Sequence, residues 1–440
     1  MTVKVIGAGL AGCEAAWQLA NAGICVELYE MKPQKYTPAH KYSGFAELVC
    51  SNSLKAERVE SAAGLLKEEM RRLGSLTMLA AEASKVSAGG ALAVNREQFS
   101  DFITDKINSH PNITVVSKEV TEIPDGYVII ATGPLTSDSL SKSIASLIGE
   151  DYLYFHDAAA PIVTAESLDR SLVFEASRYG RGEPDYLNCP MNKEEYLAFY
   201  NELVNAESAP LHDFEQEGHK DFKVYEGCMP VEVLAKRGED TMRFGPLKPV
   251  GLTDPRTGSR PYAVVQLRKE NNDGTLYNLV GFQTNLKFGE QKRVFSMITG
   301  LENAEFVRYG VMHRNTYLNS PKVLDKHFCF KPDPRIYFAG QMTGVEGYIE
   351  SAASGIYAAM SLARKLLGKS EITLPVDTML GALANYVEVG SDHSFQPMGS
   401  NMGILPELPE RIKNKQDKYA ALAKRALESL ERALNEENYI

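Results

Sequence analysis

Three glycines near the start of the chain have the spacing of a loop that binds a pyrophosphate. They lie in the run Gly7-Ala8-Gly9-Leu10-Ala11-Gly12, directly after the apolar residues 3–6. In a strand–turn–helix unit the first glycine permits the turn and the second lets the backbone approach a pyrophosphate. The third lets helix and strand pack closely. The N–H groups and dipole at the start of the helix then hold the phosphates. The run predicts a dinucleotide site.

An acidic residue at a suitable distance makes this prediction more specific. Glu30 ends the second β-rich segment, 18 residues after Gly12, where an acid binds the ribose hydroxyls of a dinucleotide. A glycine run alone is a weak signal. The order of strand, turn, helix, strand and acid is much stronger.

Two further segments favour FAD as the dinucleotide. Residues 128–133, ending in Ala131-Thr132-Gly133, resemble the strand-plus-ATG element of flavoproteins with two dinucleotide-binding folds. Residues 336–341, ending in Gly340-Gln341, resemble the closing strand of the same proteins, which lies along the ribityl chain. Gln341 replaces the usual acid, and its amide can still bond ribityl hydroxyls. No second glycine run with the spacing of residues 7–12 occurs in the sequence. We therefore expect NAD(P)H to bind transiently, without its own Rossmann unit.

Two of the six cysteines are candidates for chemistry. Cys50 is followed by polar residues typical of helix caps, so we expect a helix N-terminus to stabilise its thiolate. Cys228 lies in a turn framed by Gly227 and Pro230, where a reactive side chain can be presented. Sequence pattern alone leaves both as candidates. Cys189, in Asn188-Cys189-Pro190, is ambiguous. The three other thiols are expected to be core residues: Cys13, Cys25 and Cys329.

The elements that must position these residues indicate an α/β fold. Strands are expected near residues 3–6, 24–29, 113–116, 127–131 and 335–339, and helices over 13–21 and 349–367. Because FAD-binding segments lie near both chain ends, we expect a discontinuous, Rossmann-like FAD-binding domain with an inserted α+β domain and C-terminal helices. The expected division is 1–154, 155–330 and 331–440. Residues 411–434 carry a helical apolar stripe, which we expect to pack on the protein itself.

Composition excludes several classes of protein. With 440 residues, 44% hydrophobic and 24% charged, the chain is long enough for two or three globular domains. It has no run of 18 apolar residues and no signal-peptide pattern, so we expect no membrane partner. Six cysteines are too few for a disulfide scaffold, and their spacing matches no zinc site. We therefore expect a cytoplasmic protein without a metal.

Charge is distributed unevenly along the chain. The net charge is −10, yet residues 235–335 hold 17 Lys and Arg against 10 Asp and Glu. Such asymmetry hints at a polyanion-binding surface, although a solvated surface is about as compatible with the composition. If the stretch docks a nucleic acid, we expect Lys236, Arg237, Lys292 and Arg293 to contribute.

Six segments together resemble one family, the folate- and FAD-dependent tRNA (uracil-5-)-methyltransferases. They are residues 7–12, 45–53, 89–94 with Arg96, 225–230, 245–251 and 339–348, and the resemblance covers nearly the whole chain. It implies 5-methyluridine formation in the tRNA T-loop, with 5,10-methylenetetrahydrofolate as carbon donor and tetrahydrofolate as a bound partner. FAD would be the cofactor and NAD(P)H the reductant.

The resemblance also implies roles for particular residues. Cys228 would add to uracil C6, and Cys50 would act beside it as an acid–base group or guard of the nucleophile, though either thiol suits the addition. Tyr348 would stack on flavin or folate, or be a core residue.

Three alternatives belong to other families or classes. A related flavoprotein family modifies wobble uridines, but it carries a further C-terminal helical domain, and only about 70 residues follow the helix ending near 367 here. A small-molecule FAD oxidase would need neither thiol. A flavin-stabilised tRNA-binding protein would leave the uridine unmethylated.

Overall fold

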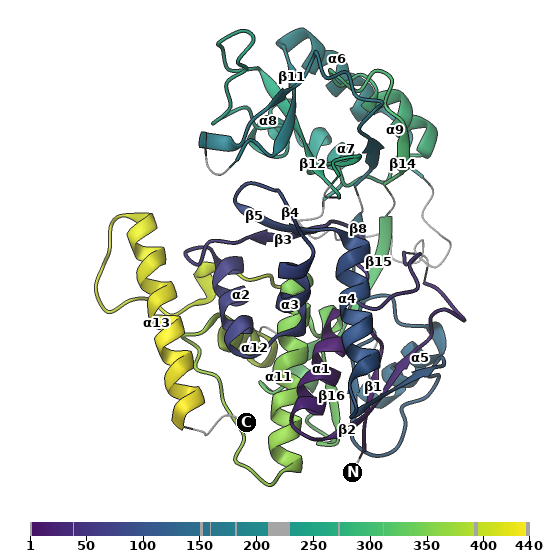
Figure 1. Ribbon diagram of the computed structural model, residues 1–440, viewed down its shortest axis with the longest axis vertical. Helices are drawn as coiled ribbons and strands as arrows, with labels where there is room; N and C mark the ends of the chain where they lie inside the picture. The colour runs from purple at the N-terminus through teal and green to yellow at the C-terminus, as the bar shows by residue number, and fades with distance from the viewer. Residues whose placement is uncertain are drawn as a thin grey trace.

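The computed structural model describes residues 2–37, 39–149, 153–158, 160–180, 183–209, 229–271, 273–310, 312–390 and 395–436. Figure 1 shows a larger body that contains both chain ends and a smaller body stacked on it. Two antiparallel strands, β8 (Leu153–Ala158) and β15 (Met312–Tyr317), run between the bodies.

A five-stranded parallel sheet forms the centre of the larger body. Its order is β16-β7-β1-β2-β6, and every pair of neighbours is parallel. The strands are β1 (Thr2–Ile6), β2 (Cys25–Glu30), β6 (Ile113–Ser117), β7 (Val128–Ile130) and β16 (Ile336–Phe338). Because β16 pairs with β7 across more than 200 residues of chain, both ends of the sequence share one sheet. This confirms the discontinuous, Rossmann-like FAD-binding fold.

Helices pack around this sheet and bury the main hydrophobic core. Helix α1 (Leu10–Asn21) begins three residues before the predicted start, at the last part of the glycine run. It packs along α11 (Tyr348–Leu366). The other helices of this body are α2 (Ala62–Arg72), α3 (Leu76–Ala83), α4 (Arg96–Ser109), α5 (Asp138–Ile148), α10 (Ser320–Val323) and α12 (Met379–Val389).

The C-terminal helix α13 (Lys415–Glu436) lies against the larger body (Figure 1). Leu422, Ala426 and Leu430 are at most 2% exposed and belong to the main core. This confirms that the apolar stripe packs on the protein itself. Among the described helices, none is long and apolar enough to cross a membrane.

The inserted body has its own sheet and its own hydrophobic core. Its strands follow the order β10-β11-β12-β13-β9-β14 and are antiparallel. They are β9 (Ile162–Thr164), β10 (Phe174–Glu175), β11 (Tyr186–Met191), β12 (Ala263–Lys269), β13 (Leu276–Leu279) and β14 (Phe306–Arg308). Its helices are α6 (Lys193–Asn205), α7 (Val231–Lys236), α8 (Thr241–Phe244) and α9 (Phe288–Phe295). This is the expected inserted α+β domain.

A small three-stranded sheet lies between the two bodies in Figure 1. Its order is β3-β5-β4, with β3 (Ser53–Ala56), β4 (Lys85–Val86) and β5 (Ala91–Val94). Strand β3 begins three residues after Cys50, so this sheet fixes one side of the Cys50 loop.

We predict that the contact between α1 and α11 tolerates no side chain at Gly355. A Cβ there would lie 2.2 Å from the Ala11 carbonyl oxygen, so the helices would have to separate. Gly355→Ala should destabilise the protein by about 1–3 kcal/mol, the usual cost of overpacking, measured by thermal unfolding. Gly289→Ala in α9 is the control, since a Cβ there meets nothing within 4 Å. Equal melting temperatures for the two variants would contradict the prediction.

Candidate active site

One pocket of about 460 Å³ gathers most of the predicted site residues. It opens where β1 and β2 end, as expected for a ligand site at the carboxyl edge of a parallel sheet. Its lining includes Gly7, Ala8, Gly9, Leu10, Ala11, Glu30, Cys50, Ala131, Thr132, Gly133, Gly340, Gln341 and Tyr348. Gly12 lies behind the lining, and Cys228 lies outside the described residues.

Glycine stands at each of the three positions of the first turn for a different structural reason. Gly7 has φ +95°, and a Cβ there would lie 2.8 Å from the Ala131 carbonyl oxygen. A Cβ on Gly12 would lie 1.8 Å from the Gly7 carbonyl oxygen, so Gly12 permits helix α1 to pack against the turn. A Cβ on Gly9 would meet nothing within 4 Å. Only at Gly9 does the protein itself leave room, and this room faces the pocket.

Glu30 is held rigidly at the end of β2. Its Oε2 accepts the Ala8 N–H at 2.9 Å, and its Oε1 accepts the Lys32 N–H at 2.9 Å. A carboxylate has about four acceptor positions, so two remain for hydroxyl groups such as those of a ribose.

Gln341 stands beside an acid that the sequence reasoning missed. Its Nε2 donates to Oε2 of Glu346 at 2.6 Å, and Glu346 also lines the pocket. An acid is therefore present at this point of the pocket, five residues further along the chain than Gln341. The sequence feature that could have indicated this acid is Glu346 between glycines, in the segment Gly344-Val345-Glu346-Gly347.

These residues fit an FAD molecule in the order of its parts. The Glu30 end suits the adenosine ribose, and the open space at Gly9 beside the start of α1 suits the pyrophosphate. Gly340 and Gln341 suit the ribityl chain, which leaves the far end, at Cys50 and Tyr348, for the ring system. The pocket also lies in the size range of cofactor sites.

Cys50 is positioned by Tyr348 and not by a helix. The expectation of a helix N-terminus after Cys50 is wrong, because the chain continues as the extended strand β3, paired with β5. Instead, the Tyr348 hydroxyl lies 2.9 Å from the Cys50 Sγ. The same oxygen accepts the N–H groups of Cys50 at 2.7 Å and Ser51 at 3.2 Å. Burial raises the pKa of Tyr348 well above its usual value, so this hydroxyl stays protonated.

Two arginines hold the backbone just before Cys50. Arg96 on α4 donates to the carbonyl oxygens of Leu48 at 2.9 Å and Val49 at 3.2 Å. Arg308 on β14 of the inserted domain also donates to Val49. Burial acts to lower the pKa of Arg96, but the Glu270 carboxylate, 2.9 Å from Arg96 Nε, outweighs it and raises that pKa. The Cys50 loop is therefore held by both domains and faces two guanidinium groups.

An ion pair between an exposed lysine and a fully buried acid lies at the same end of the pocket. Glu350 in the first turn of α11 is fully buried and accepts from Lys55 Nζ at 2.8 Å and from Ser400. Burial acts to raise the pKa of Glu350, but the Lys55 charge and the Ser400 hydrogen bonds outweigh it, so the pKa is lowered. Lys55 lines the pocket and places a positive charge there, a feature for which the sequence carried no clear signal.

The remaining described thiols differ from Cys50. Cys13, Cys189 and Cys329 are buried, and burial raises the pKa of each. The expectation that Cys25 is a core residue is wrong. It is the first residue of β2 and is exposed, because its side chain faces outward where the strand begins.

Within the described chain, no group of three His, Cys, Asp or Glu side chains is arranged to hold a metal ion.

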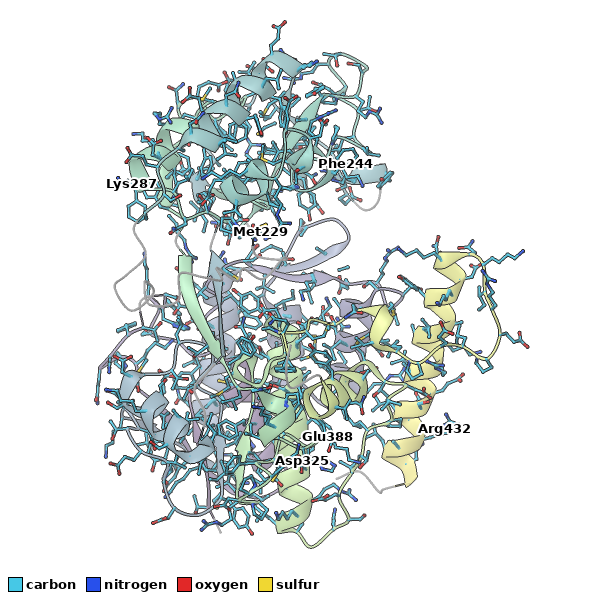
Figure 2. All side chains as sticks on the ribbon, turned by 180° about the vertical axis from the view of Figure 1, so that it is seen from behind. Met229, Phe244, Lys287, Asp325, Glu388 and Arg432 are labelled. Atoms are coloured by element: carbon cyan, nitrogen blue, oxygen red, sulfur yellow. The ribbon has the colours of Figure 1, made fainter. Side chains whose placement is uncertain are left out.

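The basic stretch is partly neutralised by acids of the inserted domain. Arg293 bonds to Glu290 at 2.8 Å and also to Glu202. Lys236 on α7, Lys292 on α9 and Arg293 itself are all exposed. Figure 2 labels Met229 and Lys287 at the edge of the inserted domain that faces the larger body.

Fold and site together define a protein of the FAD-binding class with an inserted second domain. Residues 2–370 match the family model described as "Glucose inhibited division protein A". Two crystal forms of Aquifex aeolicus GidA share the fold, with TM-scores of 0.70 and 0.69 and identities of 15% and 16%. This chain is covered to 98% and 100%, and the GidA chains to 73% and 77%.

Sequence comparison places the chain more narrowly. It is 60% identical over 429 residues to "Methylenetetrahydrofolate--tRNA-(uracil-5-)-methyltransferase TrmFO" of Acetivibrio thermocellus, covering 97% of each chain. The protein of the same name from Desulforamulus reducens is 60% identical, with 99% of this chain and 98% of that one covered. The chain therefore belongs to the family of methylenetetrahydrofolate–tRNA-(uracil-5-)-methyltransferases.

We predict that Gly9→Asp separates folding from cofactor binding. The space at Gly9 accommodates the new side chain, and an aspartate suits the position that caps helix α1, so thermal stability without flavin should be kept. Its charge would face the pyrophosphate, so the purified protein should be colourless. Gly12→Asp is the contrasting variant and should lose both stability and flavin. Full yellow absorbance in Gly9→Asp would contradict the assignment of the pocket.

Proposed function

We propose that the protein methylates C5 of a uridine in the T-loop of tRNA, with 5,10-methylenetetrahydrofolate as carbon donor. The observation that carries this proposal is that Cys50 lies at the far end of a pocket that begins with a dinucleotide turn. The name of the family indicates the substrates, and the geometry supplies a thiol beside the place for a flavin ring. NAD(P)H as reductant and a cytoplasmic location belong to the same proposal.

The first chemical step is assigned to Cys228. Uracil C5 is a poor nucleophile until a group adds at C6, and a thiolate is suited to this because it is both nucleophilic and a good leaving group. The new S–C6 bond leaves an enolate, whose C5 then bonds to the methylene carbon of the folate as one of that carbon's two C–N bonds breaks. The second C–N bond breaks when C5 loses its proton, and tetrahydrofolate leaves. Met229, the next residue in the chain, lies on the face of the inserted domain that looks toward the larger body (Figure 2).

Cys50 is assigned the acid–base role at the pocket. After C5 has gained its carbon, its proton must leave before the thiolate at C6 can be expelled. The Cys50 sulfur, fixed by Tyr348 beside the guanidinium groups of Arg96 and Arg308, suits a thiolate base. When bound and reduced by NAD(P)H, FAD would supply, as hydride, the two electrons needed to convert the donated methylene carbon to a methyl group.

One assay separates this function from the alternatives. Purified protein is incubated with tRNA lacking the methyl group, labelled methylenetetrahydrofolate and NADPH, and the nucleosides are analysed. Labelled 5-methyluridine supports the proposal. Modification of a wobble uridine, oxygen consumption with a small molecule, or tRNA binding without methylation would each favour a different function.

We predict that tRNA containing 5-fluorouridine at the target traps Cys228, because fluorine does not leave as a proton does. Cys228→Ala should lose both methylation and the adduct while keeping its FAD colour. Cys50→Ala should lose methylation but keep the adduct, since its role lies after the addition. Peptide mapping by mass spectrometry locates the attached nucleotide. An adduct on Cys50 that persists in Cys228→Ala would reverse the two roles.

We predict that exposed lysines of the inserted domain contact the tRNA backbone. Lys236→Glu combined with Lys292→Glu should weaken tRNA binding and make it less dependent on salt. The slope of log affinity against log salt concentration should fall by about 0.7–0.9 for each phosphate that the variant no longer neutralises. Lys142→Glu on α5, also exposed, is the control with the same charge change per site. Flavin reduction by NADPH should be unchanged. Equal weakening by the control would show a general charge effect. Arg293 is left intact because its charge is already paired with Glu202 and Glu290.

A further inference from the structure

The hydrogen bonds around the Tyr348 oxygen determine where its own proton points. A phenol has one O–H donor and two acceptor positions. Two backbone N–H groups, those of Cys50 and Ser51, occupy the acceptor positions at 2.7 and 3.2 Å. The Cys50 Sγ is the third neighbour, at 2.9 Å. With both acceptor positions filled, the O–H must be the donor in the contact with sulfur.

A donated hydrogen bond favours the charged form of its acceptor, so it favours a thiolate over a thiol. Two charged groups among the described residues act on Cys50 in the same direction. The guanidinium groups of Arg96 on α4 and Arg308 on β14 both interact electrostatically with the Cys50 sulfur. Glu270 stands behind Arg96 and balances part of its charge.

We propose that Tyr348 is the positioning residue that donates its phenolic hydrogen bond to the Cys50 sulfur and so holds it as a thiolate aimed into the pocket. Tyr348 begins α11, whereas Cys50 precedes β3, so the bond joins the closing part of the FAD-binding domain to its first part. Its two accepted N–H bonds fix the oxygen, and no rotation of the ring is needed to reach the sulfur.

This inference deepens the function proposed above, because it explains how Cys50 becomes a base. Its test, however, needs neither tRNA nor folate. Iodoacetamide reacts with a thiolate by forming an S–C bond as the C–I bond breaks and iodide leaves. The rate of this reaction over a pH series therefore reports how much of each thiol is ionised. A failure of tRNA methylation with the expected alkylation profile would count against the function and not against this inference.

The experiment uses the FAD-loaded protein and follows alkylation of individual cysteine peptides by mass spectrometry. Tyr348→Phe keeps the ring and removes only the hydroxyl, so the yellow colour should be kept. The midpoint of the Cys50 alkylation profile should move up by about one pH unit, and alkylation below the midpoint should slow about tenfold. Cys25, which is exposed and remote from Tyr348, is the internal control and should keep its profile.

A second variant tests the inference without removing the hydroxyl. Replacing the tyrosines by 3-fluorotyrosine makes the phenol a stronger donor while nearly keeping its size, so the Cys50 midpoint should move down. Cys25 should again be unchanged. An unchanged Cys50 midpoint in Tyr348→Phe, or in the fluorotyrosine protein if Tyr348→Phe does not fold, would overturn the proposal. A shift shared by Cys50 and Cys25 would overturn it as well.

Discussion

The close packing of α11 against α1 is the constraint on which the site depends. At Gly355 the two helices leave no space for a Cβ, and at Gly12 the turn and helix leave none either. These contacts hold α11 in the same layer as the glycine turn, although more than 300 residues separate them in the chain. Because Tyr348 is the first residue of α11, the same packing delivers its hydroxyl to the Cys50 loop.

The second domain completes the site by contributing buried charge. Removing a guanidinium from water is costly, and this cost is offset only where hydrogen bonds and opposite charges replace the water. The Val49 carbonyl replaces water around the Arg308 guanidinium. Around Arg96 the carbonyls of Leu48 and Val49 and the Glu270 carboxylate do so. Glu270 and Arg308 come from the inserted domain, whereas Arg96 comes from the larger one. A shift between the two domains would therefore move the backbone next to Cys50.

This arrangement gives the two ends of the pocket different characters. At the Glu30 end, backbone N–H groups and a rigid carboxylate present a fixed surface, as suits a tightly held nucleotide. At the far end the Cys50 thiol, the Tyr348 phenol, the Lys55 ammonium group and the Arg308 guanidinium line the pocket, and Lys55 is paired with Glu350. Such a concentration of titratable groups is typical of a reacting site.

Local sequence determined the parts of this protein that depend on near neighbours. The glycine turn, the strands of the parallel sheet and the stripe on α13 follow from backbone sterics and periodicity, and the sequence therefore predicted the fold class and the residues of the cofactor pocket that now lie together. What surrounds Cys50 could not be read in this way. Polar residues after it indicated a helix cap, but pairing with β5 made them a strand. Tyr348 and Arg308 reach Cys50 from 298 and 258 residues away, and only the tertiary packing of both domains decides such contacts.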